Sequence, residues 1–252
     1  ASQLMAQAVE QGYQTFAYSG ELPNYMYKSW FDFQIAGPSH IIENDNYGII
    51  NRSISNANQS AINEWYREKA LIYDSRIIEN DEKEDLLGCV EKVIMQHGAK
   101  VILIDNLMTA MYIDEVRSDD KYDMQGRFVK KLSKIALRYN VLILLVVHRR
   151  KNSFTTDAND EGSGSGDITN LAGLVISYDR ANQKEIESGD VEEDQRKIIV
   201  SKNRLFGKLN LKGIKVSFEE KSKRIYECQD ERSCRYGWEK EWNYDVGDTP
   251  FD

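Results

Sequence analysis

The sequence predicts an α/β protein with a mostly parallel sheet flanked by helices and antiparallel edge strands toward the C-terminus. Residues 101–104 and 141–147 are continuous apolar runs, typical of strands buried on both faces of a sheet. Between them, residues 120–139 place apolar side chains on one helical face. Strands that alternate with helices indicate a parallel sheet, and the strands after residue 170 are followed by little helix.

The other elements follow from local patterns along the chain. Helices are expected over residues 1–11, 24–33, 57–68 and 81–97. Shorter strands are expected over residues 15–18, 71–73, 174–178, 197–201, 213–218 and 224–226. Residues 149–166 are polar and rich in Gly and Ser, which is typical of a functional loop, and the acidic residues 183–195 predict a hairpin tip or loose loop.

Composition bounds the class of protein. The chain has 252 residues, 41% of them hydrophobic, and a formal net charge of -8, which argues against a surface that is basic all over. Such a charge still allows nucleic acid to bind in a lined channel. Three cysteines indicate reduced thiols, and Cys228 and Cys234 have no further Cys or His nearby, which argues against a zinc site. No apolar run is long enough for a membrane helix and no basic leader begins the chain, so we expect a cytoplasmic protein without membrane contact.

Polar side chains follow three of the predicted parallel strands. Glu21 comes after the strand at 15–18, Asp105 after 101–104 and His148 after 141–147. The carboxyl ends of parallel strands meet at one sheet edge, where ligands bind, so these groups are expected to converge. Taken singly, each has a structural interpretation: a helix N-cap for Asp105, a solvated turn for Glu21 and a satisfied structural histidine for His148.

Five segments resemble the ATPase core of the ring-shaped replicative DNA helicases, the DnaB group, and more closely Twinkle and the phage primase-helicases. They occur in the order and spacing of that family, and the resemblance covers roughly residues 1–226, the predicted core domain. The segments are FAYSGE (16–21), IDNL (104–107), VHRRK (147–151), GSGD (164–167) and VSKNRLFG (200–207).

The resemblance implies a RecA-like fold, a homo-hexameric ring and ATP with Mg²⁺ bound between subunits. Glu21 would polarise the attacking water, Asp105 would hold Mg²⁺ through water and His148 would sense the γ-phosphate. Further implied roles are an arginine finger reaching a neighbour's site (Arg204, with Lys202) and adenine stacking (Arg180 and Phe218).

Single-stranded DNA would pass through the centre of the ring. The basic cluster Arg149, Arg150 and Lys151 begins the 149–166 loop and suits phosphate contact, although three basic residues at a strand end also fit an ordinary surface. Residues 227–252 are predicted to form an acidic tail that contains Trp238. Two interpretations of the tail remain: a disordered peptide that docks on another replication protein, or a solvated terminus of no consequence.

The sequence departs from the family at one point: it contains no Gly-rich phosphate loop ending in Gly-Lys-Ser/Thr. The first helix matches the family's helix directly after that loop, so we interpret the chain as a fragment of a parent, plausibly of phage origin. We expect it to bind ATP poorly and not to unwind DNA alone. Two alternatives remain: a RecA-like ATPase that is not a helicase, such as a recombinase or signalling ring, and a non-catalytic binding module with a degenerate site.

Overall fold

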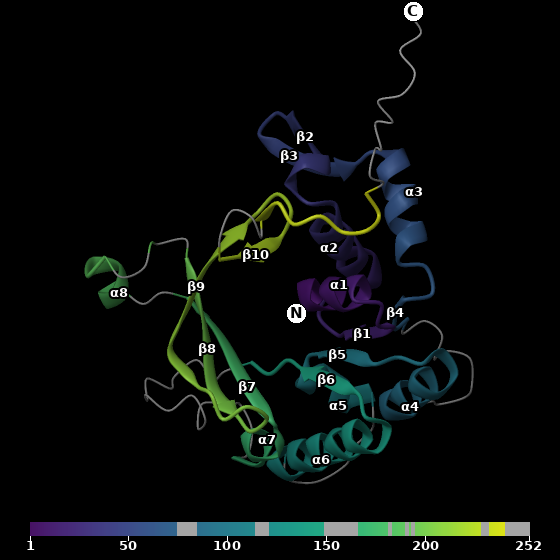
Figure 1. Cartoon of the computed structure of the whole chain (residues 1–252), viewed down its shortest axis with the longest axis vertical. Helices are drawn as coiled ribbons and strands as arrows, with labels where there is room; N and C mark the ends of the chain where they lie inside the picture. Colours follow the sequence, from purple (N-terminus) through teal and green to yellow (C-terminus); the bar gives the residue numbers. More distant parts are fainter. Residues whose placement is uncertain are drawn as a thin grey trace, which may run out of the picture.

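The structure is a computed structural model that describes residues 1–74, 85–113, 121–148, 166–180, 183–189, 192, 195–227 and 232–239. Its centre is a four-stranded parallel sheet in the order β4-β1-β5-β6 (Figure 1). The strands are β1 (Thr15–Ser19), β4 (Ala70–Ile72), β5 (Val101–Asp105) and β6 (Leu142–Leu145). All four begin within a few residues of the predicted strands.

Helices cover both faces of this sheet, which gives three layers (Figure 1). Side chains alternate along each strand, so Phe16 and Ile102 face one core while Ala17 and Leu103 face the other. The first core is completed by α4 (Leu86–His97), α5 (Leu107–Ile113), α6 (Lys121–Tyr139) and α7 (Gly166–Leu171). The second is completed by α1 (Ser2–Glu10), α2 (Asn24–Ala36) and α3 (Asn56–Trp65).

The antiparallel strands expected toward the C-terminus are present, which confirms the predicted fold class. They form a four-stranded sheet of their own in the order β10-β9-β8-β7. Among the described residues, β6 is an edge strand of the parallel sheet and β7 is an edge strand of the antiparallel sheet. The strands are β7 (Leu174–Arg180), β8 (Arg196–Asn203), β9 (Asn210–Glu219) and β10 (Arg224–Tyr226), and the short helix α8 (Gln183–Glu187) lies where a loop was expected.

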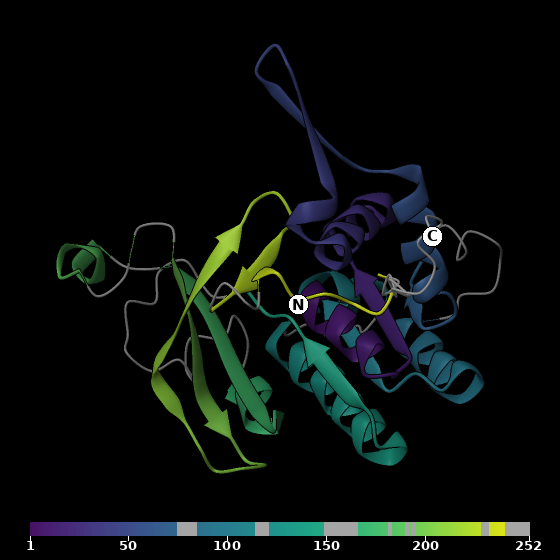
Figure 2. The ribbon, with the colours of Figure 1, turned by 45° about the horizontal axis from the view of Figure 1, so that its top comes forward.

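A hairpin that the sequence analysis missed follows α2 and the 3-10 turn η1 (Pro38–His40). Strands β2 (Ile41–Asn46) and β3 (Ile49–Ile54) pair antiparallel and project from the domain (Figure 2). Tyr47 and Gly48 form its two-residue turn with φ of 55° and 84°, the conformation that tight hairpins favour. Arg52 binds Glu43 at 2.8 Å within the hairpin and Glu220 at 3.0 Å in the β9–β10 turn, which ties the hairpin's base to the second sheet.

The predicted tail is partly folded, which corrects the expectation for residues 232–239. Trp238 is 7% exposed and belongs to the core around α1 and α2. Its indole N–H donates to the carbonyl of Ile35 at 3.1 Å, and its ring meets His40 edge to face at 4.9 Å. A large aromatic gains more by covering the helix layer than by remaining in water. Residues 228–231 and 240–252 lie outside the described part.

Truncating Trp238 to alanine is expected to lower the free energy of unfolding by about 3–5 kcal/mol, because a buried aromatic and its hydrogen bond are lost together. Urea titration followed by circular dichroism measures the change. Tyr25→Ala removes an aromatic that is 73% exposed and is the matched control, with a much smaller effect. Equal midpoints for Trp238→Ala and the wild type would contradict the packed arrangement.

No helix in the described part of the chain is long and apolar enough to cross a membrane.

Candidate functional site

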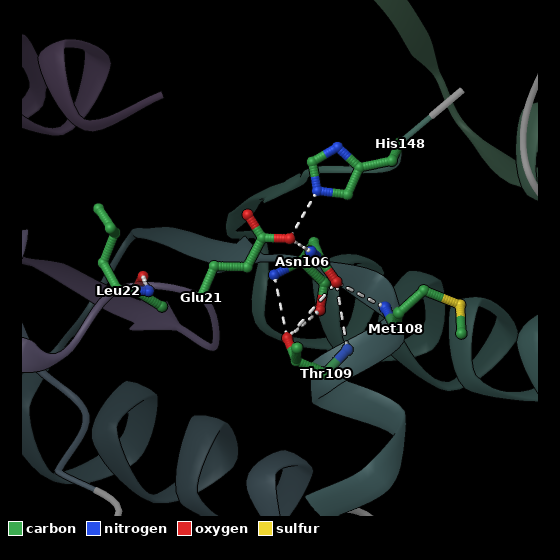
Figure 3. A network of polar contacts seen from close by, with 7 residues as sticks. Glu21, Leu22, Asn106, Met108, Thr109 and His148 are labelled. Carbon is green, nitrogen blue, oxygen red and sulfur yellow. Dashed lines mark hydrogen bonds and ion pairs between the residues drawn. The ribbon is translucent and has the colours of Figure 1, made fainter. Parts of the chain in front are cut away.

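Three predicted residues lie at the carboxyl edge of the parallel sheet. Glu21 follows β1 by two residues, Asp105 ends the adjacent strand β5, and His148 follows β6 by three residues. Glu21 and His148 are in direct contact, with 2.8 Å between Glu21 Oε1 and His148 Nε2 (Figure 3). Both side chains are about half exposed, at 52% and 56%. The convergence expected from strand order is therefore present for this pair.

Asn106 is a member of this cluster that the sequence analysis did not single out. Its amide Nδ2 donates to Glu21 Oε1 at 2.5 Å, so Glu21 lies between Asn106 and His148 (Figure 3). Asn106 is 2% exposed and precedes α5, whose first turn it caps. The only signal in the sequence was its position directly after Asp105, and that position alone did not predict which strand its side chain would meet.

The floor of the site is closely packed around Gly20. A Cβ atom there would lie 2.0 Å from Thr109 Oγ1 and 2.6 Å from the hydroxyl of Tyr18. Thr109 in turn donates its hydroxyl to the Asn106 carbonyl at 3.0 Å. The loop that carries Glu21 can approach α5 this closely only because position 20 has no side chain.

Asp105 is half-buried, and its electrostatic surroundings are mixed. Desolvation raises the pKa of the Asp105 carboxyl above its ordinary value of 3.8, and the charge of Glu21 raises it further. The amino group of Ala1 and the His148 ring act in the opposite direction.

Replacing Asp105 with asparagine is expected to stabilise the fold at pH 7. A carboxyl whose pKa is raised by folding makes the folded state progressively less stable as the pH rises from the unfolded-state pKa through the raised value. A neutral amide carries no such penalty, so the stability that Asp105→Asn gains over the wild type should shrink as the pH falls toward 3.8. Urea denaturation midpoints of the wild type and Asp105→Asn at several pH values test this expectation, and Glu68→Gln, at an exposed carboxylate, is the control. An Asp105→Asn variant less stable than the wild type at pH 7 would contradict it.

A cleft of 580 Å³ opens beside Glu21, lined by residues 18–25 with Tyr73, Asp74 and Ile113. The described residues hold no group of three His, Cys, Asp or Glu side chains placed for a metal ion. Mg²⁺ keeps several water ligands and binds through one or two carboxylates plus phosphate oxygens, so it does not require such a group. The carboxylate of Asp105, which ends β5, is the predicted ligand.

The remaining predicted site residues lie on the antiparallel sheet or outside the described residues. Lys202 donates to the carbonyls of Thr169 at 2.5 Å and Asn170 at 3.2 Å at the end of α7, while Arg204 is exposed beyond β8. At the opposite end of this sheet, Arg180 on β7 pairs with Arg196 on β8, which pairs in turn with Val216 on β9. Phe218 follows Val216 by two residues on the same strand. Arg149, Arg150 and Lys151 lie outside the described residues.

Phe218, predicted to stack on adenine, has an amine neighbour in the structure. The Nζ atom of Lys223 lies 6.0 Å from the centre of its ring and 5.2 Å from that of Trp30. Its ring is 38% exposed. The stacking of Phe218 on adenine stays a prediction.

Comparison with known proteins places the fold among known structures. An AAA domain model matches residues 40–153. No curated protein matches the sequence. Among solved structures, an ATPase domain matches with a TM-score of 0.62 at 12% identity, over 91% of this chain and 82% of that one.

Two further structures extend the comparison. A KaiC-like protein of the archaeon Pyrococcus horikoshii matches with a TM-score of 0.55 at 16% identity, over 89% of this chain and 80% of that one. A DnaB-like replicative helicase, solved with attention to its interactions with primase, matches with a TM-score of 0.61 at 12% identity, over 89% of this chain and 56% of the helicase.

The parallel sheet with its flanking helices thus has the RecA-like fold, which these ATPase structures share. The resemblance to DnaB-like replicative helicases, expected from the five sequence segments, is confirmed at the level of the fold.

Proposed function

We propose that this chain is the ATP-hydrolysing motor domain of a ring-shaped replicative DNA helicase, which couples hydrolysis at subunit interfaces to movement along single-stranded DNA. The observation that carries the proposal is the 2.8 Å contact between Glu21 and His148 at the sheet edge where strand β5 ends in Asp105. A carboxylate, a second carboxylate and an imidazole at that edge are the groups that phosphoryl transfer to water requires.

Each group has a distinct task in this proposal. Glu21 accepts a proton from the attacking water, and its half-exposed position leaves room for that water. His148 responds to the γ-phosphate, and its contact with Glu21 links that response to the base. When bound, ATP and Mg²⁺ supply the phosphoryl group and neutralise its charge, with Asp105 holding the metal through water.

Other parts of the proposed machine come from beyond this cluster. Arg204, with Lys202, would act in the site of a neighbouring subunit of a hexamer, and the basic residues 149–151 would contact DNA phosphates. Residues 1–252 contain no Gly-rich phosphate loop, and we propose that residues preceding Ala1 contribute it.

The test is ATP hydrolysis by the full-length protein with and without single-stranded DNA, together with unwinding of a forked duplex. The helicase proposal expects hydrolysis that DNA stimulates several-fold and strand separation that requires ATP. Absence of hydrolysis would oppose any ATPase function. Hydrolysis indifferent to DNA would favour the alternative of a RecA-like ATPase that is not a helicase, a candidate that the KaiC-like structural match keeps open.

A further inference from the structure

The side chain of Asn106 has only one orientation that satisfies its neighbours. Its Oδ1 accepts from two backbone N–H groups at the start of α5, those of Met108 at 2.9 Å and Thr109 at 3.1 Å. The amide NH₂ must therefore point the other way, toward Glu21. Burial of Asn106 and its cap on α5 fix the donor in place before any ligand binds.

Two donors converge on one oxygen of Glu21. Because an ionised carboxylate only accepts hydrogen bonds, the Nε2 atom of His148 must carry a proton, and Asn106 Nδ2 is the second donor to the same Oε1. Among the described contacts, Oε2 takes no hydrogen bond from protein. The charges of Glu21 and His148 both act on Asp105 at the end of β5.

We propose that Asn106 is a positioning residue for the catalytic base, which holds Oε1 of Glu21 together with His148 so that Oε2 accepts the proton of the attacking water. This inference rests on the proposed function, since it assigns a role within the same site. It adds the buried residue directly before α5 to a set drawn so far from Glu21, Asp105 and His148. It also implies that movement of His148 leaves Glu21 held by Asn106 alone.

Variants that keep the helix cap isolate this role. Asn106→Ser retains an N-cap oxygen but cannot reach Glu21, while Asn106→Asp retains the cap and presents a carboxylate oxygen where the donor was. In the full-length protein, the serine variant is expected to lower kcat for ATP by about 10-fold, with KM changed by less than about threefold. The aspartate variant should lower kcat by about 10²-fold and move the rising limb of the pH profile up by about one unit, because like charges disfavour the ionised base. Asn51→Ser, on the exposed hairpin, is the matched control.

A second measurement does not depend on catalysis. Crystal structures of the wild type and Asn106→Ser without nucleotide should differ in the place of the Glu21 carboxylate, which leaves the position beside His148 when the amide is removed. Wild-type kcat and pH profile in both Asn106 variants, or an unmoved Glu21 in the crystal, would overturn the inference. An inactive wild-type protein would instead contradict the proposed function, and the crystal comparison would then decide the positioning role by itself.

Discussion

Replacing Glu21 with glutamine is expected to slow ATP hydrolysis by the full-length protein by about 10²–10⁴-fold, the usual contribution of a positioned general base. Glutamine keeps the size of the side chain and an oxygen that can accept from Asn106, but it cannot take a proton from water. The nucleotide should still bind, because the proposed role of Glu21 is to act on the attacking water and not to hold the phosphates.

Steady-state hydrolysis and binding of a fluorescent ATP analogue separate these effects for Glu21→Gln. Glu68→Gln, at an exposed carboxylate remote from the sheet edge in sequence, controls for the loss of one negative charge. A Glu21 variant that hydrolyses ATP within threefold of the wild-type rate would exclude this residue as the base. Loss of binding and hydrolysis together would indicate a structural role for the carboxylate.

The largest effect on stability is expected at Arg224, which is 2% exposed. Its guanidinium donates to the carbonyls of Gln34 and Ile35 in α2 and to those of Arg232 and Cys234, at distances of 2.7 to 3.3 Å. It thereby joins β10, α2 and the segment that leads to Trp238. Arg224→Met leaves these acceptors buried without their donor, and we expect a loss of about 3–5 kcal/mol in the free energy of unfolding.

Urea denaturation followed by tryptophan fluorescence measures the Arg224→Met change. Arg235→Met is the matched control, since that side chain is 83% exposed and its loss should cost less than about 0.5 kcal/mol. If the two variants unfold at the same urea concentration, the four carbonyls do not depend on Arg224. A selective loss in Arg224→Met would establish it as the link between the C-terminal segment and α2.

The central sheet could be predicted from sequence because its cause is local. The apolar run from Val101 to Ile104 is buried on both faces, and its neighbours alternate with helices of clear period. The β2–β3 hairpin was missed because most of its side chains are exposed, so no burial pattern marks it. The sequence signal of the hairpin was the turn Asn46-Tyr47-Gly48, in which Gly48 is the one residue type that favours a positive φ.

The candidate site was predictable to the extent that strand order determines it. Glu21 and His148 converge because both follow parallel strands, and sequence alone identifies such positions. Asn106 was not predictable in this way, because its role depends on the direction in which the first turn of α5 orients the amide. Trp238 was assigned to a tail because acidic neighbours surround it, whereas its burial depends on a surface of α2 that includes Ile35, 203 residues earlier in the chain.

Among the described residues β6 is an edge strand, which has a consequence for the behaviour of the chain in solution. Leu142 on β6 is 55% exposed, and Ile176 and Tyr178 on the edge strand β7 are 52% and 48% exposed. Open strand edges that carry apolar side chains recruit further chains. Purified protein of residues 1–252 should therefore oligomerise as its concentration rises, visible by light scattering, and a lysine at position 142 should suppress this without touching the Glu21 cluster.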